Sequence, residues 1–219
     1  LITAVICFFK SPLEASTGRL FPFKDYDPGN GLPYPGSICT SINEELVHGI
    51  PGNRKLREGD IISVDCGTVY QGYVGDSAFT VGVGEISKQA QHLIDTTKRA
   101  LEIAIEHMVV GNRSGDVGAA VEAYVESQGF YCTHTYTGHG VGRAMHEAPQ
   151  LPNYGRPGTG FLLREGMTIA IEPMVLVGGR KTRVLRDRWT VINANGGLTA
   201  HQEHTIAVTK DGPLVLTKL

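Results

Sequence analysis

Residues 61–66 read Ile-Ile-Ser-Val-Asp-Cys, and residues 75–81 read Gly-Asp-Ser-Ala-Phe-Thr-Val. In an extended strand, successive side chains point to opposite faces of the sheet. Ser63 and Asp65 therefore share one face of the first segment, and Asp76 shares a face with small residues of the second. Each segment thus predicts a strand with one face of small or hydroxyl-bearing side chains that carries a single carboxylate.

The same pattern recurs three times further along the chain. Residues 168–173 read Thr-Ile-Ala-Ile-Glu-Pro, and residues 203–208 read Glu-His-Thr-Ile-Ala-Val, so each has a Glu on its polar face. In residues 133–139, alternate threonines and a histidine form one polar row. Five predicted strands thus each contribute one Asp, Glu or His, namely Asp65, Asp76, His139, Glu172 and Glu203.

This repetition favours a metal site over ordinary solvated sheet faces, which usually mix Lys, Arg, Glu and Thr along their length. The first two segments predict a hairpin that turns at residues 70 and 71 and places Asp65 opposite Asp76. Facing carboxylates destabilise a sheet unless a cation lies between them. Two Asp, two Glu and one His suit Mn, Fe, Co or Zn. Four carboxylates exceed the needs of one such ion, so the sequence predicts two divalent metal ions.

Two segments carry a helical pattern instead. Residues 87–108 have apolar side chains at three-and-four spacing, and Ser114 is the predicted N-cap of a second helix that ends near Gly129. Both apolar stripes predict surfaces that face the core. Helices grouped between runs of strands indicate an α+β domain with a largely antiparallel sheet.

The start of the chain is rich in proline. Residues 1–36 contain Pro12, Pro22, Pro28, Pro33 and Pro35, which exclude a long helix or a central strand there. We therefore expect residues 1–36 to be an irregular N-terminal segment and residues 37–219 to be a single domain. Within the segment, residues 1–9 favour a buried strand over a targeting remnant, because no basic residues precede them.

Composition narrows the class of protein. Of 219 residues, 41% are hydrophobic and 19% are charged, which is ordinary for a globular protein. The formal net charge of −2 is too small to favour binding to nucleic acid or to a membrane through the overall electrostatic field. The four cysteines are scattered, with no C-x-x-C pair. They favour a reducing compartment, which is the cytoplasm or an organelle, over a disulfide scaffold or a cysteine zinc site.

Other catalytic motifs do not fit. His146-Glu147-Ala148-Pro149-Gln150 lacks the second histidine of the H-E-x-x-H zinc motif. The sequence contains no G-x-S-x-G elbow and no Walker A loop. The glycines of residues 138–142 have the wrong spacing for a dinucleotide fingerprint.

Seven segments together resemble the type I methionine aminopeptidases of the pita-bread fold. They follow one another in the order and at the separations of that family, from about residue 37 to the end. Met174 after Ile-Glu-Pro favours the methionine branch over prolidase-like relatives, and the long insertion of the type II enzymes is absent. Because the family has helices before this region, the resemblance implies an N-terminal half that is incomplete. The segments are 37–51, 63–67, 73–81, 137–149, 169–174, 183–191 and 202–208.

The resemblance implies hydrolytic removal of the initiator methionine from nascent polypeptides, assisted by two metal ions, with a small second residue preferred. Asp76 and Glu203 would bridge both ions, Asp65 would complete one site, and His139 and Glu172 would complete the other. Glu172 would also be the general base. The implied substrate-facing histidines are His48 and His146. The implied methionine pocket consists of Tyr34, Cys39, Met145 and Trp189.

Two positions depart from the family, since Met145 stands where Phe is usual and Gln202 where an aromatic residue is usual.

The basic segment 180–188 is compatible with contact to ribosomal RNA, although such a run is ordinarily a solvated hairpin. We expect a monomer with no membrane partner. Two alternatives remain open: a prolidase or aminopeptidase P relative, which would cleave X-Pro peptides, and a binding module of the same fold without catalysis.

Overall fold

Antiparallel strands form the frame of the computed structural model, which describes residues 21–29 and 31–218. The strand predicted for residues 1–9 lies outside the described residues. The main sheet has the order β1-β3-β4-β13-β8-β6-β7, and β14 pairs with β13. Its strands are β1 (Cys39–Ile42), β3 (Ile61–Tyr70), β4 (Tyr73–Gly82), β6 (Gly138–Gly140), β7 (Glu147–Leu151), β8 (Thr168–Ile171), β13 (Glu203–Thr209) and β14 (Gly212–Val215).

Two smaller sheets flank the main one, and every strand pair in the described residues is antiparallel, as predicted. One sheet has the order β10-β11-β2 and the other the order β12-β9-β5. Their strands are β2 (Glu45–Val47), β5 (Tyr131–Cys132), β9 (Met174–Leu176), β10 (Thr182–Val184), β11 (Val191–Asn193) and β12 (Thr199–His201).

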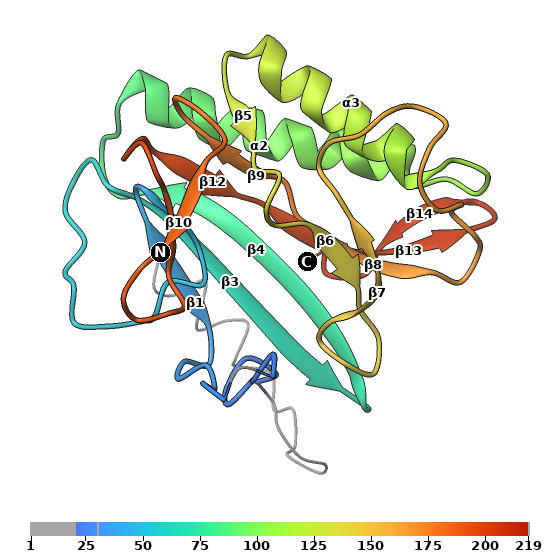
Figure 1. Ribbon diagram of the computed structural model, residues 1–219, viewed down its shortest axis with the longest axis horizontal. Helices are drawn as coiled ribbons and strands as arrows, with labels where there is room; N and C mark the ends of the chain where they lie inside the picture. Colours follow the sequence, from blue (N-terminus) through green and yellow to red (C-terminus); the bar gives the residue numbers. More distant parts are fainter. Residues whose placement is uncertain (1–20, 30, 219) are drawn as a thin grey trace.

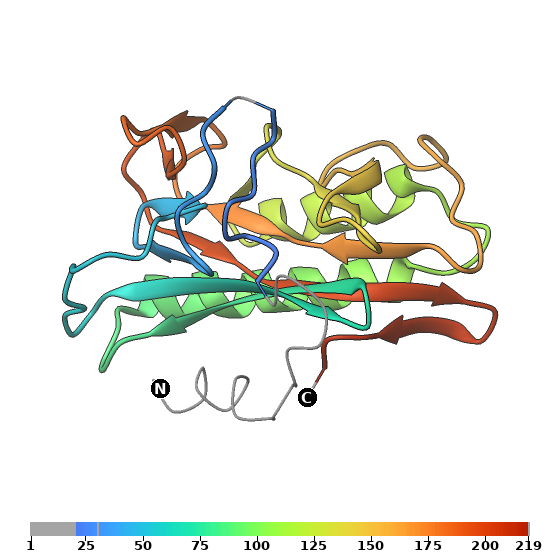
Figure 2. The ribbon, with the colours of Figure 1, turned by 90° about the horizontal axis from the view of Figure 1, so that it is seen from below.

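Two helices, α2 (Lys88–His107) and α3 (Ser114–Ser127), lie side by side on one side of the strands (Figures 1 and 2). The apolar stripe of α2 packs against the sheets as predicted, with Leu93 and Leu101 buried beside Ile169 and Ile206. The blue segment that precedes β1 lies well away from both helices (Figure 1). The helices therefore leave the other side of the sheet open for a site.

The starts of the helices differ in how they are capped. Ser87 caps α2, and its hydroxyl accepts a 3.1 Å hydrogen bond from the amide of Ala90. The prediction that Ser114 caps the second helix was wrong, because Ser114 is its first helical residue. Its hydroxyl instead accepts a hydrogen bond from the amide of Phe161, and the N-cap is Arg113. The Ser114 hydroxyl therefore binds a residue distant in sequence, Phe161, instead of capping the helix as the local pattern predicted.

The hairpin of β3 and β4 has a different register from the predicted one. Tyr70 pairs with Tyr73, so the turn consists of Gln71 and Gly72, and Asp65 pairs with Ala78 rather than with Asp76. Both turn residues have positive φ, 50° and 80°, as the favoured two-residue hairpin turn requires. Because the shift is two residues and side chains alternate with period two, both carboxylates still share one face.

The polar row predicted for residues 133–139 is not one strand. β5 ends at Cys132, and β6 begins only at Gly138. The amide of Thr135 donates a 3.1 Å hydrogen bond to the hydroxyl of Thr133, a local contact of the kind that competes with a sheet ladder. Only His139, within β6, retains the predicted strand position.

Candidate metal centre

Two rows of paired residues, each centred on an alanine, cross the main sheet. In the first row, Ala78 of β4 pairs with Asp65 on one side and with Glu203 on the other. In the second, Ala170 of β8 pairs with His139 and with Thr205. The alanines leave space above the sheet between the longer side chains. The sequence pattern of small residues with one ligand type per strand therefore produces a cavity with converging polar groups.

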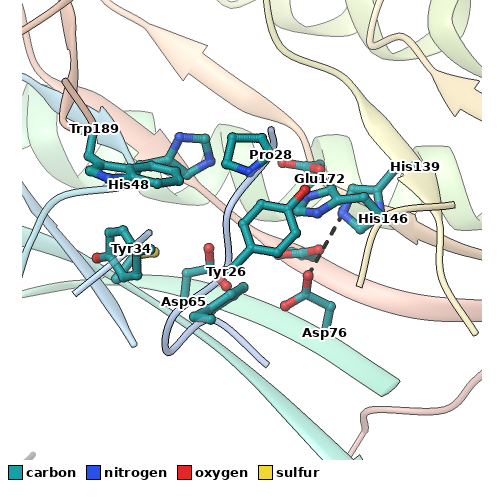
Figure 3. A pocket seen from close by; sticks show the side chains of 13 residues that line it. Tyr26, Pro28, Tyr34, His48, Asp65, Asp76, His139, His146, Glu172 and Trp189 are labelled. Atoms are coloured by element: carbon teal, nitrogen blue, oxygen red, sulfur yellow. Dashed lines mark ion pairs between the residues drawn. The ribbon is translucent and has the colours of Figure 1, made fainter. Parts of the chain in front are cut away.

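Thr205 connects the second row to Asp76. Its hydroxyl accepts a 2.8 Å hydrogen bond from the Asp76 amide and donates one of 2.9 Å to the Asp76 carbonyl. The carboxylate of Asp76 then faces His139, with Oδ2 at 3.7 Å from Nε2 (Figure 3). All five predicted ligands line one cavity of about 200 Å³. Its walls are Phe23, Tyr26, Pro28, Tyr34, Cys39, His48, Asp65, Asp76, His139, His146, Glu172, Trp189 and Glu203.

The potential ligands in and beside this cavity form two groups that share Glu203. The ligand atoms of Asp76, His139 and Glu203 lie within 4.8 Å of one another, and so do those of Asp65, His201 and Glu203. Glu172 contacts both groups, since Oε1 is 3.6 Å from Nε2 of His139 and Oε2 is 3.5 Å from Nε2 of His201. The geometry thus provides two adjacent places for a cation.

The surroundings of the four carboxyl groups raise the pKa of each of them. Burial raises the pKa of Asp65, Glu172 and Glu203 well above the ordinary range, and repulsion from neighbouring carboxylates raises it further. Burial also raises the pKa of Asp76, to about 7, although hydrogen bonds from the Ser77 amide and from Asp65 oppose this shift. Four buried acids at close range cannot all ionise at neutral pH without a compensating positive charge.

Buried polar atoms without a hydrogen-bond partner also indicate that these residues fit a divalent cation. Among the described residues, Asp65 Oδ1, Glu203 Oε1 and His201 Nε2 are buried without a hydrogen-bond partner. A buried polar atom that lacks a partner typically costs about 1–3 kcal/mol. A divalent cation would satisfy all three atoms, and an oxygen-rich set with imidazole nitrogen suits Mn, Fe, Co or Zn.

His139 is oriented by its own backbone neighbour. Its Nδ1 lies 2.9 Å from the carbonyl oxygen of Gly140, a contact that requires Nδ1 to carry the proton. The unprotonated Nε2 then faces the carboxylates, in the arrangement typical of metal-binding histidines. Burial lowers the pKa of His139, which favours the neutral imidazole.

The two predicted catalytic histidines face the same cavity. Burial lowers the pKa of His48 to about 4 and that of His146 to about 3, and the nearby His139 adds to both effects. The His146 ring lies 4.2 Å from the His139 ring and 4.9 Å from the Tyr26 ring, centroid to centroid. His48 has a φ of 59°, which is rare for a non-glycine residue and clusters at functional sites. Both imidazoles are neutral at pH 7.

Three of the four predicted pocket residues, Tyr34, Cys39 and Trp189, line the cavity. Tyr34 and Trp189 lie on the side away from His146 (Figure 3). The hydroxyl of Tyr34 donates to the carbonyl of Gly49 at 2.8 Å, and its ring packs edge-on against Trp189 at 5.1 Å. Cys39 is buried beside them, and burial raises the pKa of its thiol well above the usual range. Met145 does not line the cavity but packs behind it in the same apolar cluster.

Four lining or ligand-bearing residues were missed from the sequence. Phe23, Tyr26 and Pro28 come from the irregular segment, where no periodicity marks a residue for the site. His201 did carry a signal, because it stands two positions before Glu203 and so shares its face in an extended chain. The predicted strand begins at Glu203, two residues after His201, and therefore does not include it.

The basic segment 180–188 directly precedes the cavity residue Trp189 and does not itself line the cavity. Arg180 forms ion pairs with Glu122 and Glu126 of α3, while Lys181, Arg183, Arg186 and Arg188 are exposed. No helix of the described residues is long and apolar enough to cross a bilayer.

Comparison with known proteins assigns the chain to a known family. The sequence pattern of metallopeptidase family M24 matches residues 15–210, and the chain belongs to this family. It is 51% identical over 185 residues to a methionine aminopeptidase of Clostridium acetobutylicum, an alignment that covers 84% of this chain and 74% of that protein.

Solved structures agree with this assignment. The methionine aminopeptidase of Thermotoga maritima superposes with a TM-score of 0.87 at 48% identity, over 91% of this chain and 78% of that one. A Xaa-Pro dipeptidase of Bacillus anthracis superposes with a TM-score of 0.67 at 25% identity, over 83% of this chain and 46% of that one. The predicted pita-bread fold is confirmed, and the methionine branch is favoured over the prolidase alternative.

Proposed function

We propose that this chain removes the N-terminal methionine from polypeptides by hydrolysis of the first peptide bond, with two divalent metal ions. The observation that carries the proposal is the convergence of four carboxylates, the metal-facing imidazole of His139 and an apolar slot on one cavity. The similarity to methionine aminopeptidases supports methionine as the first residue. The family supports metal-dependent peptidase chemistry rather than a binding module without catalysis.

Asp76 and Glu203 would be shared by both ions, Asp65 would complete one site, and His139 and Glu172 would complete the other. The ligand atoms of Asp76, His139 and Glu203 lie within 4.8 Å of one another, which supports the site completed by His139. When bound, such ions polarise the scissile carbonyl and lower the pKa of water toward neutrality.

Glu172 is the proposed general base. It would accept a proton from the attacking water and pass it to the leaving amine. Its position supports this role, since it lines the cavity and contacts both His139 and His201. Among the described carboxyl groups of the cavity, only Glu172 lies within 4.0 Å of both imidazoles.

His48 and His146 are the proposed hydrogen-bond donors. A neutral imidazole donates one N–H without adding charge, and the low pKa values of both rings keep them in that state. His146 would donate to the developing oxyanion and His48 to the scissile amide. The ring of Tyr26 packed on His146 supports a fixed orientation for this donor.

The cavity also accounts for the proposed specificity. Tyr34, Cys39 and Trp189 form a slot of aromatic rings and a neutral thiol, which suits an unbranched thioether. A second cavity of about 460 Å³ adjoins the first and shares His48, His139, His146 and Glu172 with it. The following residues of the substrate would lie there, and the second side chain would pass between His48 and His146, which favours a small one.

The proposed substrates are the N-termini of nascent polypeptides, and the proposed setting is the cytoplasm or an organelle, with the chain acting as a monomer. Contact of the exposed part of segment 180–188 with ribosomal RNA stays a prediction. The deciding assay is release of methionine from Met-Ala-Ser by the metal-loaded protein, with an X-Pro dipeptide in parallel. Metal-dependent release of methionine supports the proposal. Cleavage of the X-Pro peptide alone would assign the chain to the prolidase branch and overturn it.

A further inference from the structure

His201, the last residue of β12, is a buried histidine that the proposed mechanism does not use. Its side chain is 2% exposed, and its Nε2 has no hydrogen-bond partner in the described part of the chain. This nitrogen lies 3.5 Å from Oε2 of Glu172 and 3.7 Å from Oε2 of Glu203. An imidazole with an unsatisfied nitrogen aimed at two buried carboxylates requires an explanation.

The position of His201 is fixed by the backbone around it. Its amide donates a 2.9 Å hydrogen bond to the Thr80 hydroxyl, which in turn donates one of 2.8 Å to the His201 carbonyl. Pairing of His201 with Met174 holds the other edge of β12. These backbone contacts therefore fix the position from which the His201 ring faces the carboxylates.

The spacing of the atoms matches a shared cation better than direct hydrogen bonds. Both contacts are longer than the roughly 2.7–3.2 Å of a nitrogen–oxygen hydrogen bond. Two ligand atoms that each lie about 2.0–2.2 Å from one tetrahedral ion are about 3.4 Å apart. His139 has the same spacing, with 3.6 Å to Glu172 and 3.7 Å to Asp76.

The two groups of ligand atoms are also alike in composition. Asp76 and His139 form one group with Glu203, and Asp65 and His201 form the other with the same Glu203. We infer that His201 is a sixth protein ligand, which binds the ion held by Asp65 and Glu203, so that each of the two ions has one imidazole. This inference rests on the proposed two-metal function and adds a nitrogen to the site that was expected to hold only oxygen ligands.

The direct test is NMR of the full chain with isotope-labelled histidine, loaded with an NMR-active isotope of cadmium. Scalar coupling between cadmium and a ring nitrogen appears only where the two are bonded. Of the eight histidines of the chain, His139 and His201 should show this coupling. Coupling at His139 without His201 would overturn the inference and leave the proposed function standing. Coupling at no histidine would overturn both the nitrogen ligation proposed at His139 and this inference.

A pair of variants gives a second, independent measurement. His201→Gln is compared with His204→Gln, because His204 belongs to the next strand and its Nδ1 contacts the hydroxyl of Thr217 instead of the cavity. In calorimetric titration with Co²⁺, His201→Gln should raise the Kd of one of the two ions about tenfold or more. His204→Gln should match the unsubstituted chain. Equal isotherms for all three proteins would overturn the inference, and the NMR experiment decides it even where His201→Gln does not fold.

Discussion

Oε1 of Glu172 lies 3.6 Å from Nε2 of His139, inside a cavity that both residues line. A carboxylate in this position can help to hold an ion through one oxygen while the other accepts a proton. The two roles make separate contributions to catalysis, and a conservative substitution can separate them.

Replacement of Glu172 by Gln keeps the shape of the side chain and removes its basicity. We expect kcat to fall by about 10²–10⁴-fold with metal saturating, and KM to change far less, because a general base acts in the transition state. The matched control is Glu165→Gln, at an exposed position shortly before β8. Steady-state kinetics on Met-Ala-Ser provide the measurement, and a fall in kcat of less than tenfold would show that another group is the base.

Asp76→Asn tests the shared ligand. The variant should bind fewer ions and lose turnover, because a neutral amide is a poor ligand for a hard cation. The same change should leave the melting temperature of the metal-free protein unchanged or higher, since it removes one of four crowded acids whose pKa values are raised. Metal analysis after gel filtration and a thermal melt with chelator provide both readings, with Asp211→Asn, which is exposed, as control. Full activity of Asp76→Asn would refute the two-metal mechanism.

Metal affinity should depend on pH in a defined direction. Burial raises the pKa of Asp76 to about 7, so this carboxyl binds a proton below pH 7 and must release it when an ion binds. The apparent Kd should therefore rise as pH falls below 7, by roughly tenfold per pH unit for each proton released. His146 and His201, with pKa values of about 3, stay neutral over this range and add no dependence.

Calorimetry in buffers of different ionisation enthalpy measures both the Kd and the number of protons released. The contribution of Asp76 to this pH dependence should end above pH 8, because its carboxyl is then already ionised before an ion binds. A Kd that stays constant between pH 6 and pH 8 would contradict the raised pKa of Asp76.

The substrate slot predicts selectivity at two positions. Norleucine in place of methionine should be tolerated, since a small change in an apolar slot alters binding by only about 1–3 kcal/mol. Leucine at the second position should be rejected far more strongly, because in the proposed binding mode its side chain has to fit between His48 and His146. A panel that varies each position separately, at constant metal, measures kcat/KM. Comparable values for Met-Ala-Ser and Met-Leu-Ser would refute the specificity proposal without touching the metal chemistry.

Much of the fold follows from local patterns in the chain. The period-two alternation around Asp65, Asp76 and Glu203 predicted the strands and the face that carries each carboxylate, because alternation is a property of a single extended segment. The apolar stripe of α2 was predicted for the same reason, since a helix forms its hydrogen bonds within a few residues. The pairing register of the hairpin did not follow from the alternation. The turn lies at Gln71 and Gly72, which both have positive φ, and the register therefore differs by two residues from the predicted one.

The sequence by itself therefore determined the family, the strands and the set of acidic residues, because each depends on residue types at short or recurring spacings. The tertiary structure alone decided which atoms meet. Tyr26 reaches His146 across 120 positions of the chain, and His201 reaches the carboxylates only because Thr80 and Met174 hold β12 in place. Contacts between distant segments depend on packing and on the register of neighbouring strands, and neither property is encoded in the pattern of one segment.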